Sequence, residues 1–380
     1  MSKWEWKTLQ DVCLMKIKDG THQTPTYCSP NNGFPFLSSK DITSEKINWD
    51  NIKYIIPDLH KELYAKIAPQ KDDILLAKNG TTGVAALVED DRVFDVYVTL
   101  AVLRPNQQVI LPNYLLRIVN SPICKSQFDA HLKGMGVPNL HLNEIQKVLI
   151  PVPPLSEQKR IVKFLDDEFS KIDTLKTNAE TNLKNAKELF ESELGKIFGN
   201  PIWERKNFSD LFKLKSGDYL NSKDISEGKY PVYGGNGIIA FHNKYNLNGD
   251  NVIIGRVGAL CGNVRFISEP IWLTDNAFRI VFLTDEFDYL FVTYLLNFLN
   301  LRSYARQAAQ PVISNSSLKD ISIPLPPLSV QKEIVARLDK LSENIKRLET
   351  NYKQIIANCD ELKKSILKKT FEGDSRSSRE

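Results

Sequence analysis

The sequence predicts an α+β fold with two mixed α/β globular units, each followed by a long helix. One junction occurs twice, as PVPPLSEQKRIV from Pro151 and as PLPPLSVQKEIV from Pro324, 173 residues further on. Charged segments with regularly spaced apolar residues follow both junctions, as in long amphipathic helices. Short apolar runs separated by Gly, Asn and Asp turns precede them, as in strands. Because the order of segments repeats, the chain is a duplication.

The first globular unit is predicted over residues 1–150. ILLAKNG, AALVED and VTLAVLRP are typical of strands, and YLLRIVNSPICKSQF is typical of helices. Parts of this unit recur in the second one: DDILLAKNGTTG (72–83) resembles DNVIIGRVGALCG (250–262). The globular interiors otherwise differ, whereas the junctions stay alike. The duplication therefore predicts one shared framework that carries two different surfaces.

The first junction and helix are predicted over residues 151–199. The prolines fix the direction in which the chain leaves the globular unit, and Ser156 is a candidate N-cap. Gly199 followed by Asn200 and Pro201 predicts the helix end. The predicted apolar seam of this helix contains Ile161, Leu165, Ile172 and Leu175.

The second globular unit is predicted over residues 200–323, the second junction and helix over 324–372, and a disordered tail over 373–380. Ser329 is the candidate N-cap of this helix. A helix of about 40 residues is roughly 60 Å long, and its apolar stripe needs a partner, for which the other helix is nearest. The predicted seam contains Ile334, Leu338, Leu341, Ile345, Leu348, Tyr352, Ile355, Leu362 and Ile366.

Composition and motifs exclude several classes of protein. The five cysteines form no CxxC pair, which disfavours a disulfide framework or a cysteine zinc site and favours a reducing compartment. The start of the chain has no signal-peptide pattern, and no apolar run approaches 18 residues, so we expect a cytoplasmic protein. Neither a GxxxxGK phosphate loop nor an HExxH metal motif is present. We therefore expect no nucleotide hydrolysis by this chain and no metal site on it.

Two alternative functions keep some support in the sequence. A self-contained DNA adenine methyltransferase or nuclease would rest on Asn200-Pro201-Ile202-Trp203, which is similar to the NPPY-type motif of amino-group methyltransferases. Its third position is Ile, however, and a turn after a helix explains the same residues. A coiled-coil assembly protein without a DNA role would fit the formal net charge of only +4.

The doubled PxPPLSxQKxIV junction, with a globular unit before it and a long helix after it, resembles the specificity subunit of type I restriction–modification systems. Three smaller pieces are typical of the recognition domains in that family: DGTHQTP (19–25), FPFLSSKDI (34–42) and the K/R-x-G turns at 78–80 and 256–258. The second unit departs from this pattern, because it has SGDYLNSK in place of a GTH segment.

The resemblance implies a non-catalytic subunit that reads double-stranded DNA. Each globular unit would be a target recognition domain for one half of an asymmetric bipartite site. The helices would pair as an antiparallel coiled coil, which sets the spacer, brings the two chain ends together and docks two methyltransferase (modification) subunits. Restriction subunits would complete the nuclease. S-adenosylmethionine, ATP and Mg²⁺ would belong to the partners, and no membrane is involved.

Polar and basic side chains on loops are the candidates for DNA contact, since they offer phosphate ligands and base-edge donors. Lys78 and Arg256 stand out because they recur at matching turns beside glycines. In the first unit the candidates are Thr21, His22, Gln23, Lys40, Lys78, Asn79, Thr81, Thr82, Lys133 and Asn139. In the second unit they are Lys223, Tyr233, Asn236, Arg256, Arg306, Gln307 and Gln310.

Overall fold

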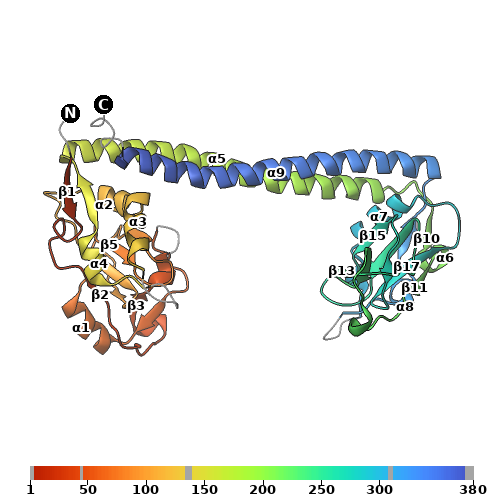
Figure 1. The fold of residues 1–380 in the computed structure, drawn as a ribbon, viewed down its shortest axis with the longest axis horizontal. Helices are drawn as coiled ribbons and strands as arrows, with labels where there is room; N and C mark the ends of the chain where they lie inside the picture. Colours follow the sequence, from red (N-terminus) through yellow and green to blue (C-terminus); the bar gives the residue numbers. More distant parts are fainter. Residues whose placement is uncertain (1–3, 43–45, 133–138, 307–310, 373–380) are drawn as a thin grey trace. The chain divides into compact units, whose positions relative to one another are not determined.

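The structure, a computed structural model, describes residues 4–42, 46–132, 139–306 and 311–372. The chain forms two compact units: unit 1 comprises residues 1–178 with 355–380, and unit 2 comprises residues 179–354. Each unit has one globular part and a portion of both long helices, α5 (Leu155–Phe198) and α9 (Leu328–Glu372) (Figure 1). The compact units therefore cut across the sequence repeats, since each repeat ends in a helix that enters the other unit.

The strands of unit 1 form three sheets, with the orders β2-β8-β5-β6, β4-β3-β7 and β1-β9. Alternate residues of the central strands face two different hydrophobic clusters: Leu76 belongs to one and Leu75 to the other. Both faces of the sheet are thus covered, which explains why ILLA is apolar without alternation. The strands are β1 (Glu5–Thr8), β2 (Lys18–Asp19), β3 (Phe34–Leu37), β4 (Lys53–Ile55), β5 (Ile74–Ala77), β6 (Ala85–Leu87), β7 (Asp95–Val96), β8 (Leu100–Leu103) and β9 (Leu149–Val152).

Proline starts three of the four α-helices in the globular part of unit 1, at a position where its missing N–H costs no hydrogen bond. These helices are α1 (Pro57–Lys66), α2 (Pro112–Val119), α3 (Pro122–Ala130) and α4 (Leu142–Lys147). Two 3-10 helices, η1 (Pro30–Asn32) and η2 (Ser39–Ile42), lie in its loops.

Unit 2 repeats the topology of unit 1, with sheets ordered β11-β17-β14-β15, β13-β12-β16 and β10-β18. Its strands are β10 (Arg205–Asn207), β11 (Phe212–Ser216), β12 (Tyr230–Gly234), β13 (Gly237–His242), β14 (Asn251–Gly255), β15 (Val264–Ile267), β16 (Trp272–Leu273), β17 (Ala277–Phe282) and β18 (Ser322–Pro324). Its helices are α6 (Phe208–Leu211), α7 (Tyr289–Phe298), α8 (Asn315–Leu318), η3 (Ser222–Asp224) and η4 (Leu301–Tyr304). The duplication predicted from the sequence is thus confirmed strand by strand.

A buried glutamine fastens each junction to its globular part. Gln158 is fully buried; its Oε1 accepts a hydrogen bond from Leu111 N at 2.8 Å, and its Nε2 donates to Val109 O and Pro153 O. Gln331 is also fully buried and makes the same three kinds of bond, with Asp288 N, Glu286 O and Pro326 O. Each side chain therefore joins the first turn of a long helix to the segment that leads into α2 or α7.

The helices begin earlier than expected, at Leu155 and Leu328. Ser156 and Ser329 lie inside the first turn and are not the N-caps that the sequence suggested. The carbonyl group of Pro154 accepts hydrogen bonds from Glu157 N and Gln158 N instead. Proline can precede a helix in this way because no backbone N–H is needed at this position and its fixed φ is compatible with entry into the helix.

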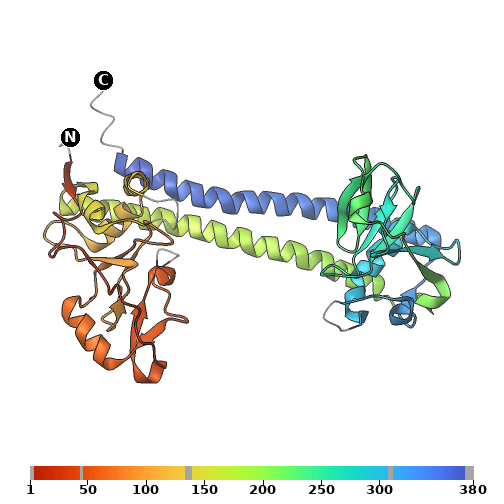
Figure 2. The ribbon, with the colours of Figure 1, turned by 60° about the horizontal axis from the view of Figure 1, so that its bottom comes forward.

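Within each unit, the segments of α5 and α9 lie side by side and run antiparallel (Figures 1 and 2). In unit 1, Lys176 Nζ lies 2.8 Å from Asp360 Oδ1, and Lys363 Nζ lies 2.5 Å from Asp173 Oδ1. An ion pair joins Arg337 to Glu193 in unit 2. The predicted seam residues Ile161, Leu165, Ile172, Ile334, Leu338 and Ile345 are buried. The predicted fold class, including the antiparallel helix pairing, is confirmed.

Three predicted seam positions are exposed: Leu175 is 50%, Leu348 39% and Leu362 46% accessible. The seam predicted from the seven-residue spacing is therefore wrong at these three positions. The predicted seam residues Leu341, Tyr352, Ile355 and Ile366 are half-buried. A straight helix has 3.6 residues per turn, so a strict seven-residue repeat drifts away from the contact face. Two helices also bury only a narrow stripe of one another, and residues at its margin remain open.

The far end of each helix packs into the unit of the other repeat. Phe371, at the end of α9, packs edge-on against Tyr114 of α2 at 5.5 Å between ring centroids. Phe198, at the end of α5, packs in the same way against Phe291 of α7 at 5.6 Å. Trp4 packs against the cluster that contains Phe371, so the first and last described parts of the chain belong to one hydrophobic core, as expected for chain ends that lie close together.

Candidate nucleic-acid interface

In unit 1, loops that are distant in sequence meet at one end of the four-stranded sheet. We name residues 20–23, 38–40, 78–82, 97–99 and 139 loop cluster 1. Thr21 pairs with Tyr97 in a parallel bridge, and Ser39 N donates to Thr99 Oγ1 at 3.0 Å. Thr81 Oγ1 donates to Ser39 O at 3.4 Å, which ties the turn to the second loop. These bonds make one continuous surface out of four chain segments.

Most of the candidate residues of the first unit lie in loop cluster 1. His22, Gln23, Lys40 and Thr81 are exposed, and His22 has 74% of its side chain open to solvent. Four further candidates are half-buried, namely Thr21, Asn79, Thr82 and Asn139. Asn79 and Asn139 pair in an antiparallel bridge, although 60 residues separate them. Lys133 lies outside the described residues. Contact of any of these residues with DNA stays a prediction.

Lys78 differs from the other candidates because its side chain points into the protein. The side chain is 7% exposed and forms an ion pair with Asp19, which is itself 10% exposed. Its backbone also joins the loops, since Lys78 N donates to Thr99 O and Lys78 O accepts from Leu140 N. The recurrence of a basic residue at this turn therefore has a structural cause: the buried side chain of Lys78 stabilises the turn through its ion pair with Asp19.

Unit 2 has the same arrangement, which we name loop cluster 2: residues 217–218, 234–237, 256–262, 274–276 and 312. Arg256 N donates to Asn276 O and Arg256 O accepts from Ile313 N, as Lys78 does with its own partners. Leu260 N donates to Asn236 Oδ1 at 3.0 Å, so the β12–β13 hairpin meets this turn. The K/R-x-G turns predicted to match are thus equivalent in their backbone hydrogen bonds.

The candidate residues of the second unit are more dispersed. Arg256 is half-buried; its guanidinium donates to Asp275 O at 3.2 Å and lies 5.2 Å from the ring centroid of Phe278. Tyr233, on β12, is only 7% exposed, and its ring belongs to a hydrophobic cluster of unit 2. Asn236 is exposed within loop cluster 2, Arg306 is exposed next to it, and Lys223 is exposed in η3. Gln307 and Gln310 lie outside the described residues.

Two further arginines adjoin loop cluster 2 and were absent from the candidates. Arg302 donates to Ala259 O at 2.6 Å. Arg265 lies on β15 with its guanidinium beside Gly237, 3.4 Å from where a Cβ would stand. Neither residue occurs in a motif or a repeated turn, so only their spatial proximity to the hairpin could have revealed them.

The polar groups inside unit 1 form structural pairs. His60 Nδ1 lies 2.7 Å from Asp95 Oδ2, and its ring stacks on Phe34. Burial raises the pKa of Asp95, with the hydrogen bond to His60 opposing that shift. Burial also raises the pKa of the Cys13 thiol to about 12 and that of Cys124 further, which leaves both thiols protonated at neutral pH. These thiols therefore lack the activation that a nucleophile needs.

Within residues 4–42, 46–132, 139–306 and 311–372, no group of three or more His, Cys, Asp or Glu side chains could hold a metal ion. No helix in the same ranges combines the length and hydropathy needed to cross a bilayer.

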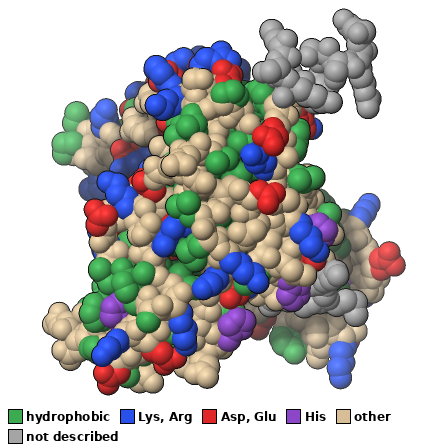
Figure 3. All heavy atoms as spheres, turned by 90° about the vertical axis from the view of Figure 1, so that its left-hand side faces the viewer, with side chains coloured by type: hydrophobic (Ala, Val, Ile, Leu, Met, Phe, Trp, Pro, Cys, Tyr) green, Lys and Arg blue, Asp and Glu red, His purple; other side chains and the backbone are tan. Residues whose placement is uncertain are grey.

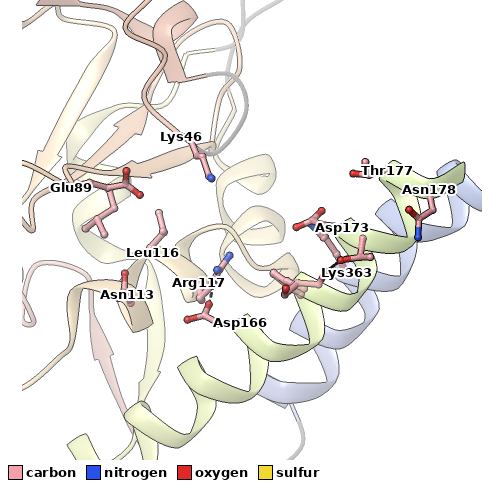
Figure 4. A pocket seen from close by; sticks show the side chains of 14 residues that line it. Lys46, Glu89, Asn113, Leu116, Arg117, Asp166, Asp173, Thr177, Asn178 and Lys363 are labelled. Atoms are coloured by element: carbon pink, nitrogen blue, oxygen red, sulfur yellow. Dashed lines mark hydrogen bonds and ion pairs between the residues drawn. The ribbon is translucent and has the colours of Figure 1, made fainter. Parts of the chain in front are cut away.

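A cleft of about 930 Å³ in unit 1 lies where α2 faces the long helices (Figure 4). Four of its charged side chains form two ion pairs: Arg117 Nη2 lies 2.7 Å from Asp166 Oδ1, and Lys363 pairs with Asp173. These pairs join α2 and α9 to α5, and Lys46 and Glu89 also line the cleft.

Charge is mixed on one face of the protein. On the face drawn in Figure 3, Lys and Arg side chains are interspersed with Asp and Glu. This face has no broad field of one sign to attract a polyanion, and the formal net charge of the chain is only +4. Binding of DNA would then have to depend on local groups in the loop clusters.

The sequence matches a known family twice. The family described as "Type I restriction modification DNA specificity domain" matches residues 1–185 and 201–357. The StySPI specificity subunit of Salmonella potsdam, a type I restriction enzyme subunit, is 25% identical over 391 residues, which cover 90% of this chain and 82% of that protein. The putative MjaX specificity subunit of Methanocaldococcus jannaschii is 25% identical over 414 residues, which cover 98% and 94%.

Solved structures agree on the fold. One similar chain comes from a structure described as the structural basis of complex assembly and conformational transition of the type I R-M system. It superimposes with a TM-score of 0.76 at 22% identity, over 98% of both chains. The HsdS subunit from Thermoanaerobacter tengcongensis gives a TM-score of 0.62 at 22% identity, over 98% of this chain and 97% of that one. At such identities the likeness concerns the fold alone.

Proposed function

The chain belongs to the type I restriction modification DNA specificity family, and from this membership we propose that its two globular parts read the two halves of one asymmetric DNA target. The relatives are specificity subunits, so the chain is the non-catalytic subunit with two recognition domains, and catalysis belongs to separate subunits. The proposal adds how the domains share the target and implies that the chain works in the cytoplasm, where it would meet that DNA.

The observation that carries the proposal is the pair of equivalent loop clusters with different side chains. Turns 78–80 and 256–258 have the same backbone partners, but His22, Lys40 and Thr81 in one cluster have no counterparts of the same type in the other. A shared framework orients both loop sets alike, while unlike side chains select unlike bases. Two different half-sites follow.

The long helices are proposed to dock two methyltransferase subunits, which would bring S-adenosylmethionine, and through them restriction subunits, which would use ATP and Mg²⁺. Exposed leucines support this assignment: Leu175 and Leu189 of α5 are 50% and 53% accessible. The residues 173 positions later, Leu348 and Leu362 of α9, are exposed as well. Because the duplication repeats these apolar positions, two equal partners would find two equal surfaces.

Mapping of methylated sites in DNA treated with the assembled complex tests the proposal. We expect a bipartite motif with two unlike halves and an unread spacer. A continuous motif, or one with identical halves, would contradict it.

The purified chain alone provides a separate test. Without partners it should transfer no methyl group and cleave no DNA, and either activity would favour the self-contained enzyme. If the chain with its methyltransferase partners retained no DNA in a sequence-dependent way at moderate salt, the assembly protein without a DNA role would be favoured.

A further inference from the structure

An irregularity in β13 exposes two neighbouring isoleucines of unit 2. Val232 pairs with Ala240 and Tyr233 pairs with Ile238, so Ile239 is an extra residue, a β-bulge. The bulge interrupts the alternation of the strand, and Ile238 and Ile239 are 51% and 58% exposed. Bulges often redirect side chains next to functional sites. The strand is also at the edge of its sheet, β13-β12-β16.

This hairpin is held against loop cluster 2 at short range. A Cβ on Gly235 would lie 2.2 Å from Val257 O, so only glycine permits the approach. Gly237 has a φ of +111°, a conformation suited to glycine, and directly precedes the isoleucines. Leu260, whose backbone binds Asn236, is itself 43% exposed. We name Ile238, Ile239 and Leu260 the hairpin surface.

Four arginines without acidic partners in the described structure adjoin loop cluster 2, to which the hairpin belongs. Arg256 and Arg302 donate to carbonyl groups of loop cluster 2, Arg265 lies beside Gly237, and Arg306 N donates to Val312 O. In the part of the chain that the structure describes, none of these four guanidinium groups is ion-paired with a carboxylate.

The globular part of unit 1 differs from unit 2 in this respect. Its three arginines each pair with an aspartate: Arg92 with Asp90, Arg104 with Asp73 and Arg117 with Asp166. Guanidinium groups that no carboxylate engages bind phosphate well, because two N–H groups can meet two phosphate oxygens. An apolar surface framed by such groups fits an occupant with both phosphates and exposed methyl groups.

Duplex DNA meets this description at thymine, whose C5-methyl is the apolar group of the major groove. We propose that the hairpin surface contacts thymine methyl groups in the half-site of unit 2, while the surrounding arginines bind the flanking phosphates. This inference rests on the proposed function and names the chemistry by which one of its two domains selects bases.

Deoxyuridine substitution tests the proposal, because it removes the methyl group and leaves every hydrogen-bonding atom of the base. The full chain is titrated with duplexes that contain the mapped target, with each thymine of the second half-site replaced in turn. We expect at least one replacement to weaken binding about fourfold, the effect of exposing one buried methyl-sized group. In a double variant, Ile238→Ser with Ile239→Ser, the same replacement should change the affinity little.

Ile202→Ser is the matched control, since Ile202 is 85% exposed in unit 2 but belongs to the turn after α5. This variant should keep the full deoxyuridine effect. Two results would overturn the inference: a second half-site without any A·T pair, or deoxyuridine duplexes bound as tightly as thymine duplexes. If binding were still sequence-specific in either case, the proposed function would stand. Loss of methyltransferase binding in the double variant, with DNA binding intact, would also overturn it. Absence of any sequence-specific binding would instead reject the proposed function.

Discussion

Lys78 and Arg256 occupy equivalent turns and both contribute to the stability of their loop clusters, Lys78 from a buried position and Arg256 from a half-buried one. The ammonium group of Lys78 is paired with Asp19, whereas the guanidinium of Arg256 donates to Asp275 O and has a buried Nε without a partner in the described structure. A buried charge with one partner removed is costly, because the remaining charge is left desolvated. Lys78, which the sequence suggested as a DNA ligand, therefore stabilises the loop that contains it.

Replacement of Lys78 by Met should destabilise unit 1 by about 3–5 kcal/mol, the typical cost of removing the charged partner of a buried carboxylate such as that of Asp19. Urea unfolding of the full chain measures this free energy. The double variant Lys78→Met with Asp19→Leu should regain most of the loss, and Lys71→Met, at an exposed position, should cost almost nothing. A Lys78→Met protein of normal stability that had lost DNA affinity would show instead that Lys78 is a direct DNA ligand.

Replacement of Gln158 by Leu should cost about 3 kcal/mol, because it leaves Leu111 N and two carbonyl groups buried without partners. Gln331→Leu should cost a similar amount in unit 2, and denaturant unfolding measures both. Gln108→Leu, at an exposed position of unit 1, provides the control. Equal stability of all three variants would mean that water replaces the glutamine bonds and that the junction is held by its prolines alone.

At the scale of elements, each long helix is held at both of its ends by different means. Its first turn is fixed to its own globular part by a buried glutamine, and its last turn is fixed by a phenylalanine in the other unit. Phe198 and Phe371 are 1% and 2% exposed and stand 173 positions apart, so the duplication preserved this contact too.

Phe198→Ala should destabilise unit 2, and Phe371→Ala should destabilise unit 1, each by about 3–5 kcal/mol, through the cavity that loss of a buried ring leaves. Hydrogen exchange should become faster in α7 for the first variant and in α2 for the second. Phe164→Ala, at a position 48% exposed on α5, should leave both helices unchanged. Faster exchange confined to the sequence repeat that carries the substitution would argue against the packing described.

At the scale of the whole molecule, the two compact units are each built from both repeats. Unit 1 contains the end of α9, and unit 2 contains the end of α5. Neither globular part thus completes its core with its own repeat alone. The helix lengths of 44 and 45 residues are nearly equal, as the duplication predicts.

Deletion of seven residues from the middle of both α5 and α9 should shorten the DNA spacer and leave both half-sites unchanged. Two helical turns measure about 10 Å, which corresponds to about three base pairs. Methylation mapping with the assembled complex reports the new motif. Altered half-sites at an unchanged spacer would show that the helices do not set the separation.

The sequence alone determined the duplication, the α+β class, the two junctions, and helix ends at Phe198 and Glu372 close to the predicted residues 199 and 372. These features are local or repeated: a proline-rich entry, a periodic apolar stripe and a glycine at the end are visible in neighbouring residues. The matching turns at 78–80 and 256–258 were also visible, because the two copies could be compared.

Only the tertiary structure decided that Lys78 faces inward, that Tyr233 belongs to the core and that Leu175, Leu348 and Leu362 are exposed. The same holds for the arginines around the hairpin surface and for the phenylalanines at the helix ends. Each of these depends on a partner far away in sequence, such as Asp19, which lies 59 residues before Lys78. Charge pairing and burial depend on which residues are neighbours in space, and such neighbours cannot be predicted from local residue patterns.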